Sequence, residues 1–237
     1  FIGSMYNEKH NLYDRLCGVN DYTKGYLDAI MKVQRSIYGY FFLEDMLKGD
    51  VLDEMMRVCP VKPNEDGVET VQYANYFLAR RMATDERTDI LSRVGRELGR
   101  ENKINLYTPD ASVRFINVNN KGTVDYYNEM PYVFRNSRIN LNITLRSIKS
   151  GIPLRCMDIC GAGGFLLSNY QADLYDVFVP GEDMVIYDSI DDLMNKCKYY
   201  LSHDAERRQI AQNGFGKIEE KHTYDVRFEE IFNRLFN

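Results

Sequence analysis

The chain has 237 residues, 44% of them hydrophobic and 27% charged, which suffices for one large domain or two small ones with an ordinary soluble core. Lys and Arg number 30 against 35 Asp and Glu, a net charge of −5, so the basic excess typical of general nucleic-acid or membrane-surface binders is missing. No apolar run approaches the ~18–20 residues of a membrane span, and no signal peptide is recognisable, so we expect a cytoplasmic protein without a membrane span.

The first hundred residues are predicted to be mostly helical. Apolar residues at spacings of three and four predict a helix over residues 22–47, and turn residues follow at 64–67. The helical pattern resumes at Val71, and a further helix is expected to begin at Thr84, a capping residue. Because this block is longer than a crossover between strands needs, we interpret about residues 21–100 as an inserted helical subdomain.

Strands and helices alternate in the rest of the chain. Short apolar runs predict strands at residues 1–5, 104–107, 113–116, 139–143, 165–167 and 184–187. Helices are expected at residues 126–136 and 153–160, after the capping residue Ser189, after residues 202–204, and in a last segment that carries Tyr224. This alternation is typical of an α/β fold with a doubly wound, Rossmann-like parallel sheet.

The cysteines and acidic pairs indicate no metal site. The five cysteines are an odd number without a CxxC pair, and the three histidines lie far from them in sequence, so we interpret the thiols as reduced. Asp191 and Asp192 fit the first turn of a helix better than a metal-binding pair. His222 invites a role as a catalytic base, but packing or capping before the last helix is the favoured interpretation.

Residues 151–165, with the sequence GIPLRCMDICGAGGF, form the clearest candidate site. A glycine turn precedes a short helix, and the unpaired amides of a helix N-terminus are a natural phosphate site. Arg155 adds a fixed positive charge with planar donors, and the carboxylate of Asp158, one turn later, could accept hydrogen bonds from two ribose hydroxyls. From the spacing alone, a structural Arg155–Asp158 pair on an exposed helix is an equally good interpretation.

Two common nucleotide-binding motifs do not fit this segment. The glycines at 161–164 form no dinucleotide fingerprint, because Leu166 stands where the last glycine is required and the segment leads from a helix into a strand. There is no Walker A lysine pattern either. An oxidoreductase and a P-loop ATPase are therefore not favoured.

Residues 123–236 resemble the C-terminal half of group 1 glycosyltransferases, in the CgeB-like, spore-maturation branch. The motifs that carry the resemblance are GIPLR, D-x-x-G-x-G-G-F-L-L, YYLSHDAER and HTY, and the opening FIGSMYNEKHNLYDRL resembles the start of that family's donor-binding domain. The resemblance implies a GT-B enzyme with two Rossmann-like domains, in which the C-terminal one holds most of the nucleotide-sugar donor.

On this resemblance, residues 1–237 correspond to the donor-binding domain. The N-terminal acceptor domain would be missing, in keeping with a chain that opens on Phe1 rather than Met. The implied reaction is hexosyl transfer from a nucleoside diphosphate sugar, with UDP expected, to an unknown glycan, protein or lipid acceptor. Retention of configuration is expected, with no obligatory metal and no cofactor besides the nucleotide sugar as co-substrate.

The resemblance also implies roles for particular residues. Asp158 falls where the family has an acid that binds the donor ribose, the backbone of residues 152–154 matches the turn that contacts the diphosphate, and residues 117–126 lie where the base is held. Arg155 is the catalytic candidate, since it would stabilise charge on the departing diphosphate. The donor-binding candidates are Gly3, Ser4, Tyr126, Asn142, Ile152, Pro153, Leu154, Arg155, Asp158, Gly161, Gly163 and Gly164.

A second hypothesis comes from a departure from the family pattern. Gly151 stands where related retaining enzymes carry a further acid near the sugar. The competing interpretation is therefore a non-catalytic nucleotide-sugar-binding or scaffolding module that kept the fold. Asn140 and Asn142 share one strand face, so that one could line the cleft while the other satisfies backbone groups.

Overall fold

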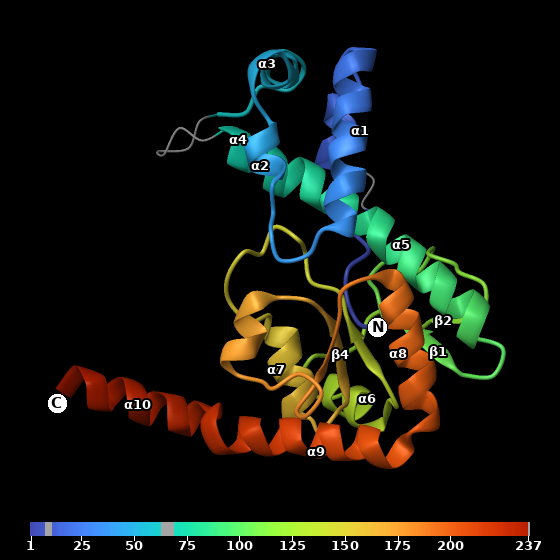
Figure 1. Ribbon diagram of the computed structural model, residues 1–237, viewed down its shortest axis with the longest axis vertical. Helices are drawn as coiled ribbons and strands as arrows, with labels where there is room; N and C mark the ends of the chain where they lie inside the picture. Colours follow the sequence, from blue (N-terminus) through green and yellow to red (C-terminus); the bar gives the residue numbers. More distant parts are fainter. Residues whose placement is uncertain (8–10, 63–68, 237) are drawn as a thin grey trace. The chain divides into compact units, whose positions relative to one another are not determined.

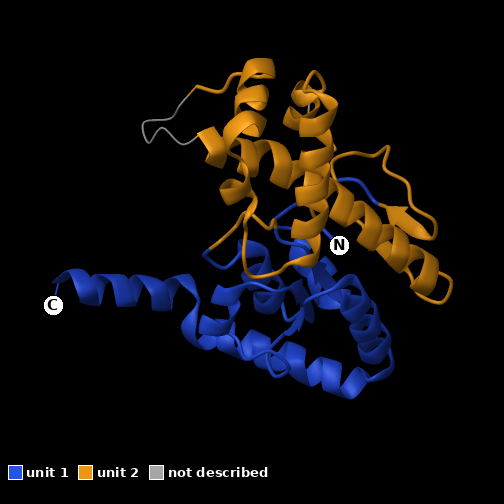
Figure 2. Ribbon diagram, turned by 45° about the horizontal axis from the view of Figure 1, so that its top comes forward, with its two compact units in different colours: residues 1–2, 121–144, 150–237 blue, residues 3–120, 145–149 orange. Residues whose placement is uncertain are grey.

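The computed structural model describes residues 1–7, 11–62 and 69–236, and the chain divides into two compact units. Unit 1 contains residues 1–2, 121–144 and 150–237, and unit 2 contains residues 3–120 and 145–149 (Figure 2). The turn predicted at residues 64–67 lies outside the described residues.

Unit 1 is built on a three-stranded parallel sheet in the order β3-β4-β5 (Figure 1). The strands are β3 (Asn140–Asn142), β4 (Leu166–Asn169) and β5 (Val185–Tyr187). Every residue of β4 and β5 is buried, as expected of parallel strands covered on both faces. The predicted α/β, Rossmann-like class is confirmed, with the parallel strands of the described residues divided between two small sheets.

The helices of unit 1 follow the local signals in its sequence. They are α6 (Met130–Asn136), α7 (Leu154–Gly161), the 3-10 helix η3 (Ala172–Asp176), α8 (Ile190–Ser202), α9 (Asp204–Lys221) and α10 (Tyr224–Phe236). Pro131 lies in the first turn of α6, where its missing N–H needs no partner. The Ser189 hydroxyl accepts a hydrogen bond from the Asp192 N–H at 3.1 Å, which confirms the predicted cap of α8.

Unit 2 is mostly helical and carries a two-stranded parallel sheet of β1 (Ile104–Leu106) and β2 (Val118–Asn120). Its helices are η1 (Leu12–Leu16), α1 (Asp21–Ser36), α2 (Leu43–Met46), α3 (Gly49–Val58), α4 (Glu69–Gln72), the π-helix η2 (Tyr73–Leu78) and α5 (Ala79–Leu98). The last three run on continuously, and the buried side chains of η2 and of the first turn of α5 join those of α1, α2 and α3 in one hydrophobic core.

The single helix predicted over residues 22–47 is wrong, because the chain leaves the helix after Ser36. The buried Gln34 side chain holds the break: its amide donates to the carbonyls of Ile37 and Tyr40 at 3.2 and 2.9 Å and accepts the Phe42 N–H at 2.8 Å. The Gln34 side chain thus forms hydrogen bonds with backbone groups that would otherwise need partners in a continued helix.

The helix start predicted at Thr84 is also wrong. Thr84 lies in the interior of α5, where its hydroxyl donates to the carbonyls of Tyr6 at 2.8 Å and Arg80 at 3.1 Å. Ile90 and Leu91, from the predicted apolar stripe, are fully buried as expected of a core-facing helix.

Two predicted strands are replaced by other structure. Residues 1–5 show only an isolated bridge, and residues 113–116 contain an isolated bridge at Phe115 followed by a turn at Ile116. Part of the predicted base-binding loop 117–126 is itself a strand. The reason is a close approach to α5: a Cβ on Gly95 would lie 2.2 Å from the Ile116 carbonyl oxygen. The helix expected from residue 126 begins only at Met130.

Two glycines in α9 give a matched test of packing. A Cβ at Gly214 would lie 2.5 Å from the Asp183 carbonyl oxygen, whereas a Cβ at Gly216 would meet nothing within 4 Å. Gly214→Ala should lower the free energy of unfolding by about 1–3 kcal/mol through overpacking. Gly216→Ala should raise it by about 0.5–1 kcal/mol, because alanine favours the helix. Urea denaturation of both variants measures the difference, and equal effects would contradict this packing.

Candidate functional site

The candidate site begins with the order of elements β3, α7 and β4. Because β3 and β4 are parallel, the helix between them starts at the carboxyl edge of the sheet and ends at its amino edge (Figure 1). Ligands of open α/β sheets bind at the carboxyl edge. The N-terminus of α7 is therefore at the edge where a ligand is expected.

The start of α7 is open and lacks a side-chain cap. Gly151 has a φ of +87°, which favours glycine, and its N–H donates to the carboxylate of Asp173 at 2.5 Å. Pro153 is the N-cap without a capping side chain, and the exposed Leu154 follows it. The first amides of a helix have no acceptor inside it, so the partial positive charge of this helix end faces outward.

Two predicted site residues come together here: Asp158, in the middle of α7, and Tyr126, from the segment before α6. The Tyr126 hydroxyl donates to the Asp158 carboxylate at 2.8 Å, and this hydrogen bond raises the pKa of Tyr126 above its usual value. Tyr126 is 44% exposed, so the pair can be reached from solvent. The hydrogen bond fixes one oxygen of Asp158 and leaves further lone pairs of the carboxylate for a ligand.

Arg155 does not pair with Asp158 in the described part of the chain. Its guanidinium contacts the Met130 sulfur and lies 5.5 Å from the centre of the Phe134 ring. The structural Arg155–Asp158 pair that the spacing allows is thus not formed. The positive charge of Arg155 is held against α6, without a carboxylate partner among the described residues.

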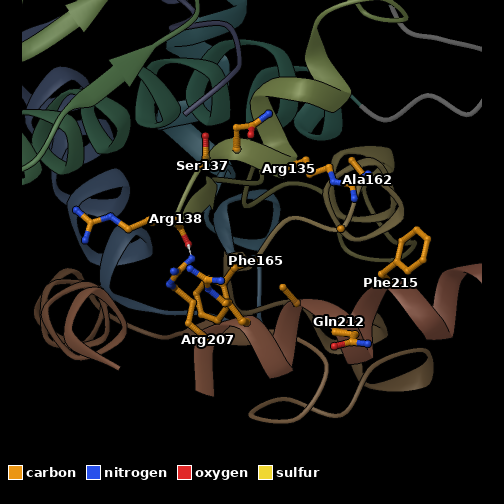
Figure 3. Close-up of a pocket in the computed structure, with 12 residues that line it drawn as sticks. Arg135, Ser137, Arg138, Ala162, Phe165, Arg207, Gln212 and Phe215 are labelled. Carbon is orange, nitrogen blue, oxygen red and sulfur yellow. Dashed lines mark hydrogen bonds between the residues drawn. The ribbon is translucent and has the colours of Figure 1, made fainter. Parts of the chain in front are cut away.

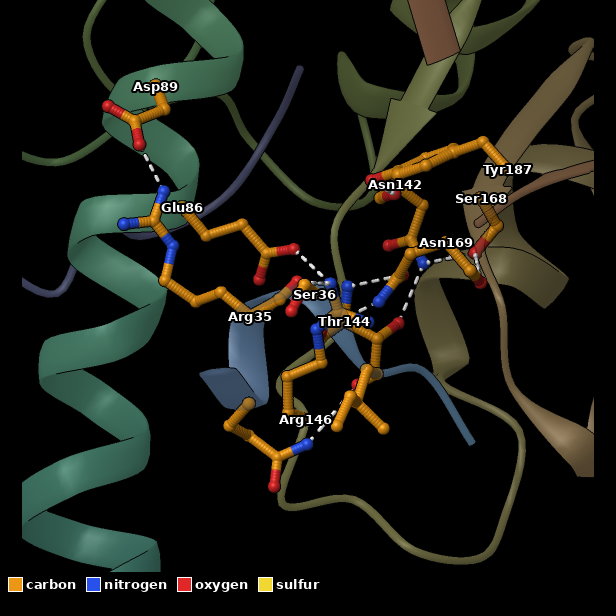
Figure 4. Close-up of polar contacts among 12 residues, drawn as sticks. Arg35, Ser36, Glu86, Asp89, Asn142, Thr144, Arg146, Ser168, Asn169 and Tyr187 are labelled. Atoms are coloured by element: carbon orange, nitrogen blue, oxygen red, sulfur yellow. Dashed lines mark hydrogen bonds and ion pairs between the residues drawn. The ribbon is translucent and has the colours of Figure 1, made fainter. Parts of the chain in front are cut away.

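Asn142, another predicted donor ligand, lies inside a buried polar network (Figure 4). Its amide nitrogen donates to the hydroxyls of Thr144 at 2.9 Å and Ser168 at 3.0 Å, and lies 3.4 Å from the sulfur of Cys156 on α7. These contacts bind β3 to β4 and to α7. The role of Asn142 toward a donor stays a prediction.

Asn169 is a residue that the sequence analysis missed. Its side chain binds the backbone of Thr144 twice, accepting the N–H at 2.8 Å and donating to the carbonyl at 3.0 Å (Figure 4). It therefore continues the pairing of β3 and β4 beyond the last backbone pair. The signal in the sequence is the polar pair Ser168–Asn169 directly after an apolar run.

The glycines at 161–164 lie at the other end of α7. Gly161 is its last residue, Gly163 follows with a φ of +76°, and a Cβ on Gly164 would lie 2.6 Å from the amide nitrogen of Asn140. An eight-residue helix is about 12 Å long, which separates these glycines from residues 151–154. The structure does not bring them together with the rest of the predicted site, and their local role is to end α7 and to allow close packing.

Gly3 and Ser4 belong to unit 2 and have local partners there. The Gly3 N–H donates to the Tyr107 carbonyl at 3.0 Å, and the Ser4 hydroxyl accepts the Tyr6 N–H at 2.9 Å. The Ser4 carbonyl accepts a hydrogen bond from Arg87. Their assignment to the donor site stays a prediction.

The remaining candidates have structural contacts. His222 ends α9, and the nearby Arg227 and partial burial lower its pKa, burial being the larger cause. Asp192 lies in the first turn of α8 and pairs with Lys196 at 2.6 Å, as its interpretation as a helix-start residue predicts. Burial raises the pKa of the Cys156 thiol to about 12.

Within residues 1–7, 11–62 and 69–236, no three His, Cys, Asp or Glu side chains form a group that could hold a metal ion. Over the same ranges, no helix combines the length and the apolar character needed to cross a bilayer.

The fold defines the class of protein: an α/β domain with a Rossmann-like parallel sheet. The sequence model of a family described as glycosyl transferase-like matches residues 66–233, most of the chain, and the chain belongs to this family. The match includes β3, α7 and β4, and it supports the C-terminal half of a GT-B glycosyltransferase. No curated protein sequence matches the chain.

The contact between Asn169 and Thr144 can be tested directly. Asn169→Ala removes the partners of two backbone groups of the buried Thr144, which should lower the free energy of unfolding by about 3 kcal/mol. Asn213→Ala is the control, because Asn213 is exposed and both of its hydrogen bonds, to the Glu182 carbonyl at 2.8 Å and from the Gln209 amide at 2.9 Å, lie at the surface. Urea denaturation should show a change within about 0.5 kcal/mol for the control. A similarly small change for Asn169→Ala would contradict its assigned role.

Proposed function

We propose that this chain is the donor-binding domain of a glycosyltransferase and that it holds a nucleoside diphosphate sugar at the N-terminus of α7. The observation that carries the proposal is the hydrogen bond from Tyr126 to Asp158, since Asp158 is on a helix that starts at the carboxyl edge of a parallel sheet. Both residues lie within the region that matches the glycosyltransferase-like family.

Two groups of α7 would recognise different parts of the donor. The outward-facing first amides of α7 and the guanidinium of Arg155 would stabilise the negative charge of the diphosphate, most of all when it departs as the leaving group. The Asp158 carboxylate would accept hydrogen bonds from the ribose hydroxyls, with Tyr126 fixing its orientation. Charge and hydroxyl recognition are then about one helical turn apart.

The finer proposals follow the family resemblance. The nucleotide is UDP, the sugar is a hexose, and the transfer retains configuration without an obligatory metal. The protein belongs to the CgeB-like branch, acts in the cytoplasm, and receives its acceptor, a glycan, protein or lipid, on a separate N-terminal domain. Within the donor-binding domain 1–237, about residues 21–100 are a helical insertion.

One observation favours a second candidate function, a binding or scaffolding module without transferase activity. Neither Ser150 nor Gly151 carries a carboxylate near the site where the sugar would lie. If no other group replaces this acid, the domain binds the nucleotide sugar without transferring the sugar.

The nucleotide site is tested by Asp158→Ala. Loss of hydrogen bonds to a charged group should weaken UDP binding by about 1–3 kcal/mol, measured by isothermal titration calorimetry with UDP and GDP. Tyr126→Phe, which removes the hydroxyl but keeps the ring, should weaken binding less. Asp225→Ala, an exposed aspartate in the first turn of α10, is the control with the same change of charge. Unchanged UDP affinity in Asp158→Ala would contradict the proposal that Asp158 binds the donor ribose.

An activity assay separates the enzyme from the scaffold. Hydrolysis of UDP-hexoses and transfer to added acceptors are measured for this chain and for the full-length parent protein. We expect the chain alone to bind nucleotide but to turn over poorly, since the acceptor site is assigned to the other domain. Full activity of the chain alone would contradict that division, and inactivity of the parent with intact UDP binding would favour the scaffold.

A further inference from the structure

A cavity of about 590 Å³ lies in unit 1, away from the start of α7 (Figure 3). Residues 135–138, which lead into β3, form one wall, and residues 162–165, which lead into β4, form another. Helix α9 closes it with residues 207–215. Since these loops precede parallel strands, the cavity is at the amino edge of the sheet, opposite the proposed donor site.

The lining of this cavity is strongly positive. Four arginines line it: Arg135 from the last turn of α6, Arg138 from the loop before β3, and Arg207 and Arg208 from α9. No lining residue is acidic. Asp204, at the start of α9, pairs with both Arg207 and Arg208, so one carboxylate serves two guanidiniums. The described lining therefore contains arginines but no carboxylate, and the ion pairs of Arg207 and Arg208 are shared with Asp204 outside the lining.

Arg207 shows this imbalance most clearly. It is only 7% exposed; its guanidinium donates to the Arg138 carbonyl at 2.8 Å and to Asp204. Its Nε is buried without a hydrogen-bond acceptor in the described structure. A buried cation with an unfilled donor is costly, and an anion in the adjoining cavity would reduce that cost.

We propose that this cavity binds a small, soluble anion that carries a phosphate group, at a site distinct from the donor site. Its volume is that of small-molecule sites, and guanidinium groups match phosphate oxygens in a bidentate manner. The rings of Phe165 and Phe215 and the amide of Gln212 also line the cavity, so that an organic part of the ligand has apolar and polar contacts (Figure 3).

The test is calorimetric titration with pyrophosphate, in the presence of saturating UDP. The double variant Arg135→Gln/Arg208→Gln removes two guanidiniums and leaves both contacts of Arg207 in place. Loss of two charged partners should weaken pyrophosphate binding by at least about tenfold. Arg234→Gln, on the exposed face of α10, is the charge-matched control and should bind as the unaltered chain does.

Arg155→Gln separates this site from the proposed donor site. Pyrophosphate binding in the presence of UDP should survive this substitution, because Arg155 does not line the cavity. This result does not depend on whether UDP itself binds. A failure of the proposed donor site would be seen separately, in the UDP titration. Circular dichroism checks the fold, and the single variant Arg135→Gln replaces the double variant if the latter does not fold.

Three outcomes would overturn the proposal. They are absence of pyrophosphate binding at millimolar concentration, unchanged binding in the cavity variant, and loss of binding in Arg155→Gln. Binding to vesicles of anionic phospholipid without binding of soluble pyrophosphate would also overturn it, because the occupant would then be a membrane surface.

Discussion

The structure of unit 1 depends on a buried polar network where β3 and β4 end. The Asn169 side chain forms hydrogen bonds with both backbone groups of Thr144. The Asn142 amide contacts the hydroxyls of Thr144 and Ser168 and the sulfur of Cys156, which is on α7. Inside a protein such hydrogen bonds are strong when all partners are present and costly when one is missing. The network therefore fixes the end of β3 and the position of α7, on which the candidate site is built.

Helix α7 presents different chemistry at its two ends. At its start, outward-facing amides, Arg155 and Asp158 offer charge and carboxylate recognition at the edge where α/β proteins bind ligands. After its end, Gly164 packs closely against Asn140 of β3 and the Phe134 carbonyl of α6, and Gly163 borders the arginine-lined cavity. The two proposed positions for anionic groups thus lie near opposite ends of one helix, and only the first is at the carboxyl edge typical of the fold.

Unit 2 has its own core and its own buried polar contact (Figure 4). Arg146, from the short segment between β3 and α7, pairs with Glu86 of α5 at 2.6 Å, and both side chains are almost fully buried. The Arg146 guanidinium also lies 3.2 Å from the centre of the Tyr38 ring. A buried pair of this kind is destabilising if either partner is removed, so it ties the segment 145–149 firmly to unit 2.

The sequence by itself determined the α/β class, the strands of the β3-β4-β5 sheet, the cap at Ser189 and the position of Arg155 and Asp158 on a short helix, because these depend on residues a turn or less apart. Only the tertiary structure decided the helix break held by Gln34, the interior position of Thr84 and the contacts of Asn142 and Asn169. Thr84, Asn142 and Asn169 have partners that are distant in the chain, and local periodicity carries no information about them. The partners of Gln34 are near in the chain, but an apolar spacing does not reveal a polar side chain that bonds to backbone groups.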